Sequence, residues 1–235
     1  MPVTRPHTFN SGFELLNHFG CSADVETVKN EEMFFNCDLD FARLHGGPIT
    51  HAFIDALPED WKQGDVVFDS RVHMLMPGDS PAIPGYHHDD IYRRPNPLGQ
   101  QFNEAGQPIA PQPDYDDLKY KSEHIMGLVN AHVAPTIFAK GKCTMPAVPE
   151  GDNIYRLWHD KVEELIESGE METFEAPDRQ LIGFSWQDFH TGQPANQFGW
   201  RWFGRVSRNT DRVDNITNEI RRNANVYKAY PTQGW

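Results

Sequence analysis

The chain has 235 residues, of which 38% are hydrophobic and 12% aromatic, and this composition is typical of one globular domain rather than of a disordered chain. The formal net charge of −13 disfavours a nucleic-acid partner, because phosphate binding depends on Lys and Arg. No apolar run approaches the ~20 residues that a membrane span needs. The N-terminal residues lack the apolar core of a signal peptide, so we expect a cytoplasmic protein. In that reducing compartment the three scattered cysteines are expected to be free thiols.

The first part of the chain, up to about position 60, is expected to be a helical support without chemistry of its own. Ser11 and Glu14 form a capping-box pattern, which predicts a helix over 11–20. A weaker helix is expected over 22–30. Apolar spacing and a proline near the start predict another helix over 48–57.

From position 66 the hydrophobic period changes to two, which predicts a strand. One face of this strand carries Asp69, Arg71 and His73. These side chains either face water or line the interior of a barrel that holds a polar ligand, and the pattern fits both. The opposite, apolar face is formed by Val66, Phe68, Val72, Met74 and Met76.

Residues 93–117 are rich in Pro and Gly and poor in apolar side chains, which predicts a long irregular loop. This loop directly follows the segment 86–90, which contains the candidate metal ligands described below, so we expect it to be an active-site lid. Further strands are predicted over 122–138, 181–184 and 200–207, with a turn at position 190.

An amphipathic helix is predicted over 152–169, and a short helix near 216–222 in the polar tail 209–235. The buried stripe of the first of these would be formed by Ile154, Leu157, Trp158, Val162, Leu165 and Ile166. No repeat or linker divides the chain, so we expect a single domain.

The segment 86–90 contains two H-x-D pairs. In an extended chain residues i and i+2 point to the same side, so His87 and Asp89 can bind one ion, and His88 and Asp90 have the same spacing on the other side. His190 is a candidate third ligand. Two imidazoles and one carboxylate on three corners of an octahedron leave three corners open, which is the arrangement of non-haem Fe(II) oxygenases.

Two arginines follow His190 on one predicted strand face. A buried guanidinium needs an anionic partner or several acceptors, and its planar fork matches a carboxylate. Arg201 and Arg205 could therefore bind an anionic ligand, pair with acids of the chain, or lie at the surface of an edge strand. The face they share also carries Phe203, and the opposite face carries Trp200, Trp202 and Val206.

Three short motifs, in this order, resemble the Fe(II)/2-oxoglutarate-dependent oxygenase superfamily, and most nearly its phytanoyl-CoA-dioxygenase-like branch. They are YHHD at 86–89, HTGQPAN at 190–196 and WRWFGRVS at 200–207, and the likeness extends over about 66–208. The resemblance implies a mainly β fold, a double-stranded β-helix or jelly roll over 61–208, supported by N-terminal and inserted helices.

The same resemblance implies that His87, Asp89 and His190 bind Fe(II). In the resemblance an aromatic residue stands directly before the first ligand. Tyr86 has this place before His87, which favours the pair of His87 and Asp89 over that of His88 and Asp90. Arg201 would bind the distal carboxylate of 2-oxoglutarate. With O2, the cosubstrate would be converted to succinate and CO2 while the substrate is hydroxylated, and no side chain beyond the metal ligands is expected to be catalytic.

Further residues are candidates for binding the cosubstrate and the substrate. Asn130 and Thr136 stand where the middle strands of such enzymes often contact the cosubstrate. Arg205 shares a face with the proposed anchor, so either arginine could hold the carboxylate. Apart from the resemblance, Arg71, His73, Arg205 and the loop over 93–117 indicate a polar small molecule as the substrate, with an anion among the candidates, although each of these residues could instead be structural.

Two other classes of protein fit part of the pattern. A cupin-like metalloprotein that binds Zn(II), Mn(II) or Ni(II), as an isomerase or a binding protein, explains the triad but gives Arg201 no role. A non-enzymatic jelly-roll protein explains the strands alone.

Overall fold

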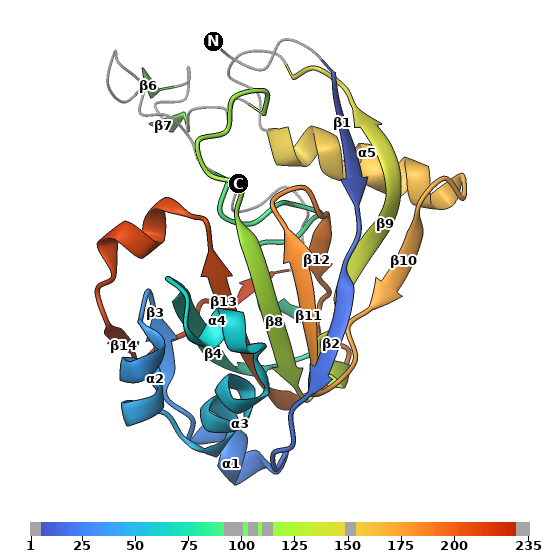
Figure 1. Ribbon diagram of the computed structural model, residues 1–235. Helices are drawn as coiled ribbons and strands as arrows, with labels where there is room; N and C mark the ends of the chain where they lie inside the picture. The colour runs from blue at the N-terminus through green and yellow to red at the C-terminus, as the bar shows by residue number, and fades with distance from the viewer. Residues whose placement is uncertain (1–5, 92–100, 103–107, 110–114, 149–153, 229–235) are drawn as a thin grey trace.

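The computed structural model describes residues 6–91, 101–102, 108–109, 115–148 and 154–228. Two antiparallel sheets form its core (Figure 1). The larger has the order β2 (Glu14–His18), β11 (Gln180–Ser185), β8 (Glu123–Val129), β13 (Gly199–Arg208) and β4 (Val67–Leu75). The smaller contains β1 (His7–Ser11), β9 (Thr136–Met145) and β10 (Glu172–Glu175), and β12 (His190–Gly192) also pairs with β9. The predicted mainly β, jelly-roll class is confirmed.

Buried side chains join the two sheets. Phe138 of β9 lies 5.4 Å from Phe184 of β11, measured between ring centroids. Met126 and Leu128 of β8 belong to the same buried cluster. Apolar side chains of β8, β9 and β11 therefore fill one part of the space between the sheets. Polar side chains line another part, which is described below.

Helices cover the outer sides of the sheets. The larger sheet packs against α1 (Val25–Lys29), α2 (Leu39–His45), α3 (Pro48–Ala56) and α4 (Glu59–Lys62). Phe53 of α3 lies 5.6 Å from Trp202 of β13 between ring centroids. The smaller sheet is covered by α5 (Ile154–Glu167), whose Trp158 lies 5.4 Å from Phe9 of β1 (Figure 1). The predicted helices over 22–30, 48–57 and 152–169 are confirmed in the described residues as α1, α3 and α5. α1 begins later than predicted, at Val25, whereas α3 begins at Pro48 as predicted.

The predicted capping-box helix over 11–20 is wrong, because this segment forms the end of β1 and the strand β2. The Ser11 hydroxyl donates to the carbonyl of Ala139 at 2.5 Å and accepts the N–H of Phe189 at 2.8 Å, so it does not cap a helix. Pairing of β1 with β9 satisfies the backbone instead. Tertiary hydrogen bonds thus override the local pattern.

Three other boundaries differ from the prediction. The strand over 122–138 is two strands, β8 and β9, separated by the 3₁₀ turn η1 (Ala131–Val133). The expected turn at position 190 is the short strand β12. The tail carries no helix at 216–222, because η2 (Asp211–Asn215) is followed by β14 (Glu219–Arg221), which pairs with β3 (Met33–Phe35). The supposed helical support and the tail are therefore joined in a small sheet.

The described residues also contain two short two-stranded sheets: β5 (Asp79–Ser80) pairs with β15 (Tyr227–Lys228), and β6 (Gln101–Phe102) pairs with β7 (Pro108–Ile109). Most of the predicted lid, 93–117, lies outside the described residues.

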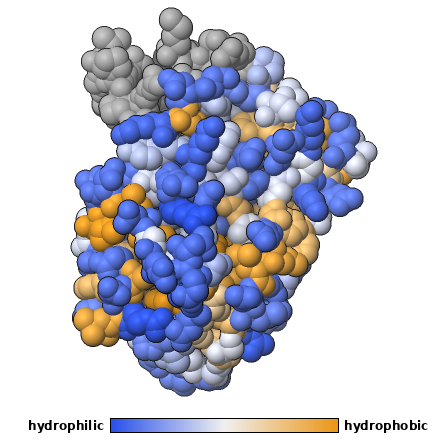
Figure 2. Space-filling model, viewed as in Figure 1, coloured by the Kyte–Doolittle hydropathy of each residue, from blue (hydrophilic) through white to orange (hydrophobic). Residues whose placement is uncertain are grey.

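The surface and the cysteines agree with the composition. Figure 2 shows a mainly hydrophilic face interrupted by separate apolar patches. Within the described ranges, every helix is too short or too polar to cross a membrane. Cys21, Cys37 and Cys143 are free thiols, as predicted.

Candidate metal centre

The backbone brings the two histidine segments together, although about a hundred residues separate them. His87 and His190 form an isolated antiparallel bridge, in which the N–H of each donates to the carbonyl of the other at 3.0 and 3.2 Å. Gly85, at φ +106, makes the turn that leads into this bridge, a conformation that favours glycine. β12 itself pairs with β9, which anchors His190 in the smaller sheet.

Three side chains converge beside this bridge. One ligand atom each from His87, Asp89 and His190 lie within 4.8 Å of one another. The Nε2 atom of His87 is 3.7 Å from one carboxylate oxygen of Asp89, and that of His190 is 3.3 Å from the other. When the His, Cys, Asp and Glu side chains of the described residues are compared, these three are the group whose spacing could hold a metal ion.

The imidazoles are oriented by backbone carbonyls. Nδ1 of His87 lies 2.8 Å from the carbonyl of Gly85, and Nδ1 of His190 lies 3.2 Å from the carbonyl of Asp188. A carbonyl only accepts, so Nδ1 of each ring carries a proton, and Nε2 is the nitrogen that faces Asp89 and is available to a metal. Burial lowers the pKa of His87 to about 4, which keeps the ring neutral and able to bind a metal.

The alternative H-x-D pair does not converge. His88 points into an aromatic cluster, with its ring centroid 4.0 Å from that of Phe189 and 4.9 Å from that of Phe9. Asp90 turns instead toward Arg205 and Arg212. The geometry therefore favours the pair of His87 and Asp89.

Arg201 lies in the same cavity and has no carboxylate partner in the described part of the chain. Its side chain is 2% exposed, and Nη2 donates to the Thr136 hydroxyl at 2.9 Å. Its Nε has no hydrogen-bond partner among the described residues. Burial lowers the pKa of Arg201 to about 10, which still leaves it charged at neutral pH. A buried, unpaired guanidinium is costly, and an anionic ligand would relieve that cost.

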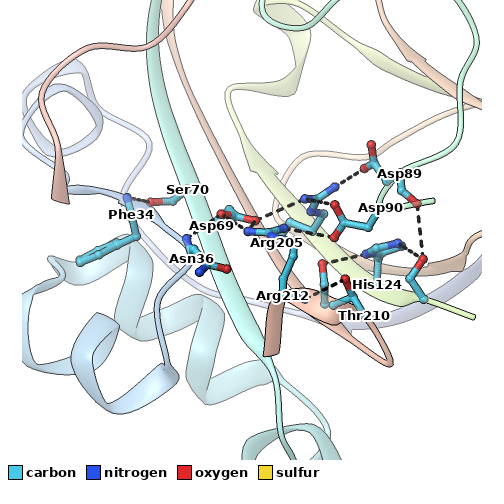
Figure 3. A network of polar contacts seen from close by, with 12 residues as sticks. Phe34, Asn36, Asp69, Ser70, Asp89, Asp90, His124, Arg205, Thr210 and Arg212 are labelled. Atoms are coloured by element: carbon cyan, nitrogen blue, oxygen red, sulfur yellow. Dashed lines mark hydrogen bonds and ion pairs between the residues drawn. The ribbon is translucent and has the colours of Figure 1, made fainter. Parts of the chain in front are cut away.

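Arg205, on the same face of β13, is surrounded by carboxylates. It donates to Asp89 through Nη1, and its Nη2 lies 3.3 Å from Asp69 and 3.5 Å from Asp90. Arg212 closes the network at 2.7 Å from Asp69 and 3.1 Å from Asp90 (Figure 3). Two guanidiniums thus face three carboxylates, one of which is Asp89 of the triad, and this group of five side chains carries one negative charge in excess.

This network fixes the ionisation of the candidate ligand. Burial opposes the charged form of Asp89, but Arg205, followed by His190, holds the pKa of Asp89 well below its ordinary value. His124 ties the network to the backbone, since its Nε2 lies 3.2 Å from the Ser122 hydroxyl, which donates to the carbonyl of Asp89 at 3.4 Å. Asp89 is therefore ionised and held from two directions.

The triad, the pair of Arg201 and Thr136, and the network of Arg205, Arg212, Asp69 and Asp90 all line one cavity of about 470 Å³. The predicted strand face of Asp69, Arg71 and His73 lines it, so these side chains face the interior and not the outer surface of the sheet.

Asn130 lies elsewhere: at φ +60 it starts η1, and its amide donates to the carbonyls of Ala23 and Trp200. The structure does not bring it to the cavity. The full lining is Phe35, Asp69, Arg71, His73, Pro81, Ala82, His87, Asp89, Asp90, Met126, Thr136, His190, Gly192, Arg201, Phe203, Arg205 and Arg212.

Two lining residues come from segments for which the sequence predicted no site residue. Phe35 belongs to β3, within the supposed helical support, and Arg212 belongs to the tail. The basic composition of the tail was a signal, but its contact with Asp69 and Asp90 depends on the fold.

The donor set of the triad, two imidazole nitrogens and one carboxylate, suits Fe(II) and related divalent ions. Asp69 and Asp90 balance the charges of Arg205 and Arg212, so the negative charge of Asp89 is left in excess and favours a cation at this position. The triad could hold a metal ion, and the rest of the cavity leaves space for further ligands on it.

Comparisons with known proteins give distant structural likeness alone. No family model matches the chain, and no curated protein matches it. It is similar to HygX from Streptomyces hygroscopicus with nickel and 2-oxoglutarate bound, at 10% identity over 84% of this chain and 82% of that one, with a TM-score of 0.42. It is also similar to ThoJ, a non-heme monooxygenase, in its nickel complex (10% identity, 84% and 73% covered, TM-score 0.38).

A third similar structure is EvdO2 from Micromonospora carbonacea var. aurantiaca complexed with 2-oxoglutarate. Its identity to this chain is 9%, with 70% of this chain and 61% of that one covered and a TM-score of 0.36. Likeness of this degree leaves the function to be argued from the side chains of the cavity.

Proposed function

We propose that the protein is a non-haem Fe(II)- and 2-oxoglutarate-dependent oxygenase that hydroxylates a polar small molecule. The observation that carries this proposal is one cavity that holds both a His-Asp-His triad and a buried guanidinium without a carboxylate partner in the described residues. A cupin-like metalloprotein would need the triad but would leave Arg201 without a task. A non-enzymatic jelly roll would need neither.

In this proposal His87, Asp89 and His190 hold Fe(II). The carbonyls behind the two imidazoles keep Nε2 of each ring directed at the metal position. Arg205 keeps Asp89 ionised and in place without binding the metal itself. The three protein ligands leave the remaining metal positions for the cosubstrate and O2.

Arg201 and Thr136 hold the distal carboxylate of 2-oxoglutarate. Their mutual hydrogen bond of 2.9 Å spans the two sheets, since Arg201 lies on β13 and Thr136 on β9. The guanidinium can give two parallel hydrogen bonds to a carboxylate, and the hydroxyl can add a third. Met126 and Phe203 give this part of the cavity apolar walls that exclude water.

When bound, the cofactor set supplies the oxidation: 2-oxoglutarate loses CO2 and takes one oxygen atom of O2 to become succinate, and the other atom enters the substrate as a hydroxyl group. The chain binds and orients these molecules, and no side chain is required as a general base. The phytanoyl-CoA-dioxygenase-like branch and the cytoplasmic location stay predictions.

Anaerobic absorption spectroscopy tests this proposal. Addition of Fe(II) and then 2-oxoglutarate to the wild type should give a weak visible charge-transfer band that saturates at one equivalent of the keto acid. His190→Ala is the matched control and should give no band. Absence of the band in the wild type, with correctly folded protein, would remove the oxygenase and favour the cupin-like metalloprotein.

A further inference from the structure

A second branch of the cavity opens from the same triad. It has a volume of about 370 Å³ and shares Arg71, His73, His87 and Asp89 with the first. Arg201 does not line it. Pro81 and Ala82 also line both branches. The remaining walls are Ile83, His88, Arg221, Asn223, Asn225 and Tyr227, so the C-terminal segment forms much of this branch.

Three guanidiniums gather around the ring of Phe35, which lines the first branch. Arg71 lines both branches, Arg212 the first and Arg221 the second. The guanidinium carbons of Arg71, Arg212 and Arg221 lie 5.6, 5.5 and 3.6 Å from its centroid. The ring face attracts cations, but it cannot neutralise three of them. Each guanidinium therefore needs an anionic partner.

Two of the three have such a partner. Arg212 pairs with Asp69 and Asp90, and Arg221 lies 2.8 Å from Glu219. Arg71 differs from both.

Arg71 forms no ion pair with the described residues. Its Nη1 donates to two carbonyls, those of Phe34 and Ser70, each at 2.7 Å. The two bonds hold one nitrogen of the fork and leave Nε and Nη2 without a partner in the described part of the chain. Burial lowers the pKa of Arg71, and Arg221 and Arg205 add to this effect against the opposing charge of Asp69. A fixed, half-buried guanidinium that faces a cavity is suited to a planar or tetrahedral anion.

The far wall of the branch is polar and neutral. Asn223 and Asn225 offer amides, and Tyr227 offers a hydroxyl that lies 3.5 Å from the Asn225 amide nitrogen. The segment is held in place by the pairing of β15 with β5 and by Lys228, 2.6 Å from Asp79. Such groups recognise hydroxyl or amide substituents on a ligand.

We propose that this branch is the substrate subsite and that the substrate is a small organic anion whose carboxylate or phosphate group binds Arg71, with Arg221 beside it. The polar part of the molecule would face the C-terminal segment. That the bound anion is the substrate rests on the proposed function, whereas the anion site itself does not depend on iron. The cavity would then bind two anions, 2-oxoglutarate at Arg201 and the substrate at Arg71, with His87 and Asp89 lining both branches.

The test is calorimetric titration of metal-free protein with inorganic phosphate and, separately, with acetate. The wild type should bind at least one of them, and the preferred probe indicates a phosphate ester or an organic acid. Arg71→Gln keeps a donor for the two carbonyls but loses the charge, and it should weaken binding roughly tenfold or more. Arg71→Lys should recover part of the loss. Arg222→Gln is the matched control, because Arg222 is largely exposed, pairs with Glu32 and does not line this branch.

Arg221→Gln provides a second variant in case Arg71→Gln does not fold, since Arg221 is 34% exposed; it should weaken binding about threefold or more. Equal affinities for wild type and Arg71→Gln would overturn the proposal. So would loss of binding in Arg201→Gln alone, which would mean that the probe occupies the cosubstrate pocket, or no binding of either probe to the wild type. The visible band of the wild type with Fe(II) and 2-oxoglutarate is read separately: its absence removes the proposed function but leaves an anion site at Arg71.

Discussion

Two arginines four residues apart on the same face of β13 occupy opposite electrostatic environments. Around Arg205, two guanidiniums face three carboxylates, and the balance is negative. Around Arg201 the described residues offer a hydroxyl and no carboxylate, so the balance is positive. The same side chain on the same strand face thus supports a cation at one end and an anion at the other. The partners, rather than the arginines, decide the role.

Their pKa shifts have opposite signs for the same reason. Burial lowers the pKa of Arg201 to about 10, and no charged neighbour among the described residues opposes this. Burial acts on Arg205 too, but Asp90, followed by Asp89 and Asp69, outweighs it and raises the pKa of Arg205. The charge of Arg205 is therefore compensated by carboxylates of the chain, although its Nε, like that of Arg201, has no hydrogen-bond partner among the described residues. The charge of Arg201 has no such compensation in the described residues.

Removal of Asp89 should have the largest effect. Asp89→Ala deletes a metal ligand and also takes one carboxylate from Arg205, so the negative balance that favours a cation disappears. We expect Fe(II) binding and succinate formation to be abolished, as for His87→Ala and His190→Ala. The measurements are Fe(II) titration and succinate assay, with circular dichroism as a check of folding.

His88→Ala is the control for that series. His88 contacts Phe9 and Phe189 and not the triad, so its loss should lower thermal stability but leave Fe(II) affinity within about threefold of wild type. Loss of iron binding in His88→Ala together with normal binding in His87→Ala would place the motif one position later.

Arg201→Lys should give the next largest effect. Lysine keeps the charge but not the fork, and the loss of a buried, charge-assisted pair costs on the order of 2–4 kcal/mol, or roughly thirty- to a thousandfold in 2-oxoglutarate affinity. Fe(II) affinity should hardly change, because the triad is untouched. Titration of 2-oxoglutarate into metal-loaded protein measures it, and Thr136→Val, which removes the neighbouring hydroxyl, should give a smaller loss in the same direction.

Arg205→Lys should reverse that pattern. Because Arg205 positions Asp89, we expect Fe(II) affinity to fall about ten- to a hundredfold, while the metal-saturated variant binds 2-oxoglutarate within about threefold of wild type. Arg208→Lys, on the same strand but paired with Asp60 and Glu123, is the control and should change neither affinity. A selective loss of 2-oxoglutarate binding in Arg205→Lys would exchange the two roles.

The smallest expected effect is a pH dependence of stability at the Arg205 end. Burial, with Arg205 adding to it, lowers the pKa of His124 to about 4 from an ordinary value of 6.5. Between these pH values the unfolded chain binds the proton and the folded chain does not, so the free energy of unfolding falls as the pH drops through this window. One such group contributes a slope of up to about 1.4 kcal/mol per pH unit.

Urea unfolding at pH 7, 6 and 5 measures this slope. His124→Gln should flatten it by up to that amount, whatever its effect on stability at pH 7. His132→Gln changes an exposed histidine and should leave the slope unchanged. Identical slopes for His124→Gln and wild type would contradict the account.

Sequence patterns predicted the parts of the site that depend on short-range geometry. H-x-D spacing in an extended segment places His87 and Asp89 on one side whatever the fold, and strand alternation places Arg201 and Arg205 on one face. The mainly β class followed from the same alternation and from the resemblance.

The choice between the two arginines could not be made in this way. It depends on Asp69 and Asp90, which reach Arg205 only through the pairing of β13 with β4 and the turn after Asp89. The capping-box pattern at Ser11 failed for a similar reason, because its hydroxyl finds partners in β9 and beside Phe189. Local signals are reliable where the backbone alone satisfies them, and they fail where distant strands compete.

A crystal structure of the protein with Mn(II) in place of Fe(II) and with 2-oxoglutarate tests the central claim most directly. The account predicts that the metal lies among His87, Asp89 and His190, and that the distal carboxylate of 2-oxoglutarate contacts Arg201 and Thr136. Arg205 should keep its contacts with Asp89 and Asp69. A carboxylate bound to Arg205, or a metal-loaded cavity in which Arg201 remains without a ligand at saturating 2-oxoglutarate, would contradict it.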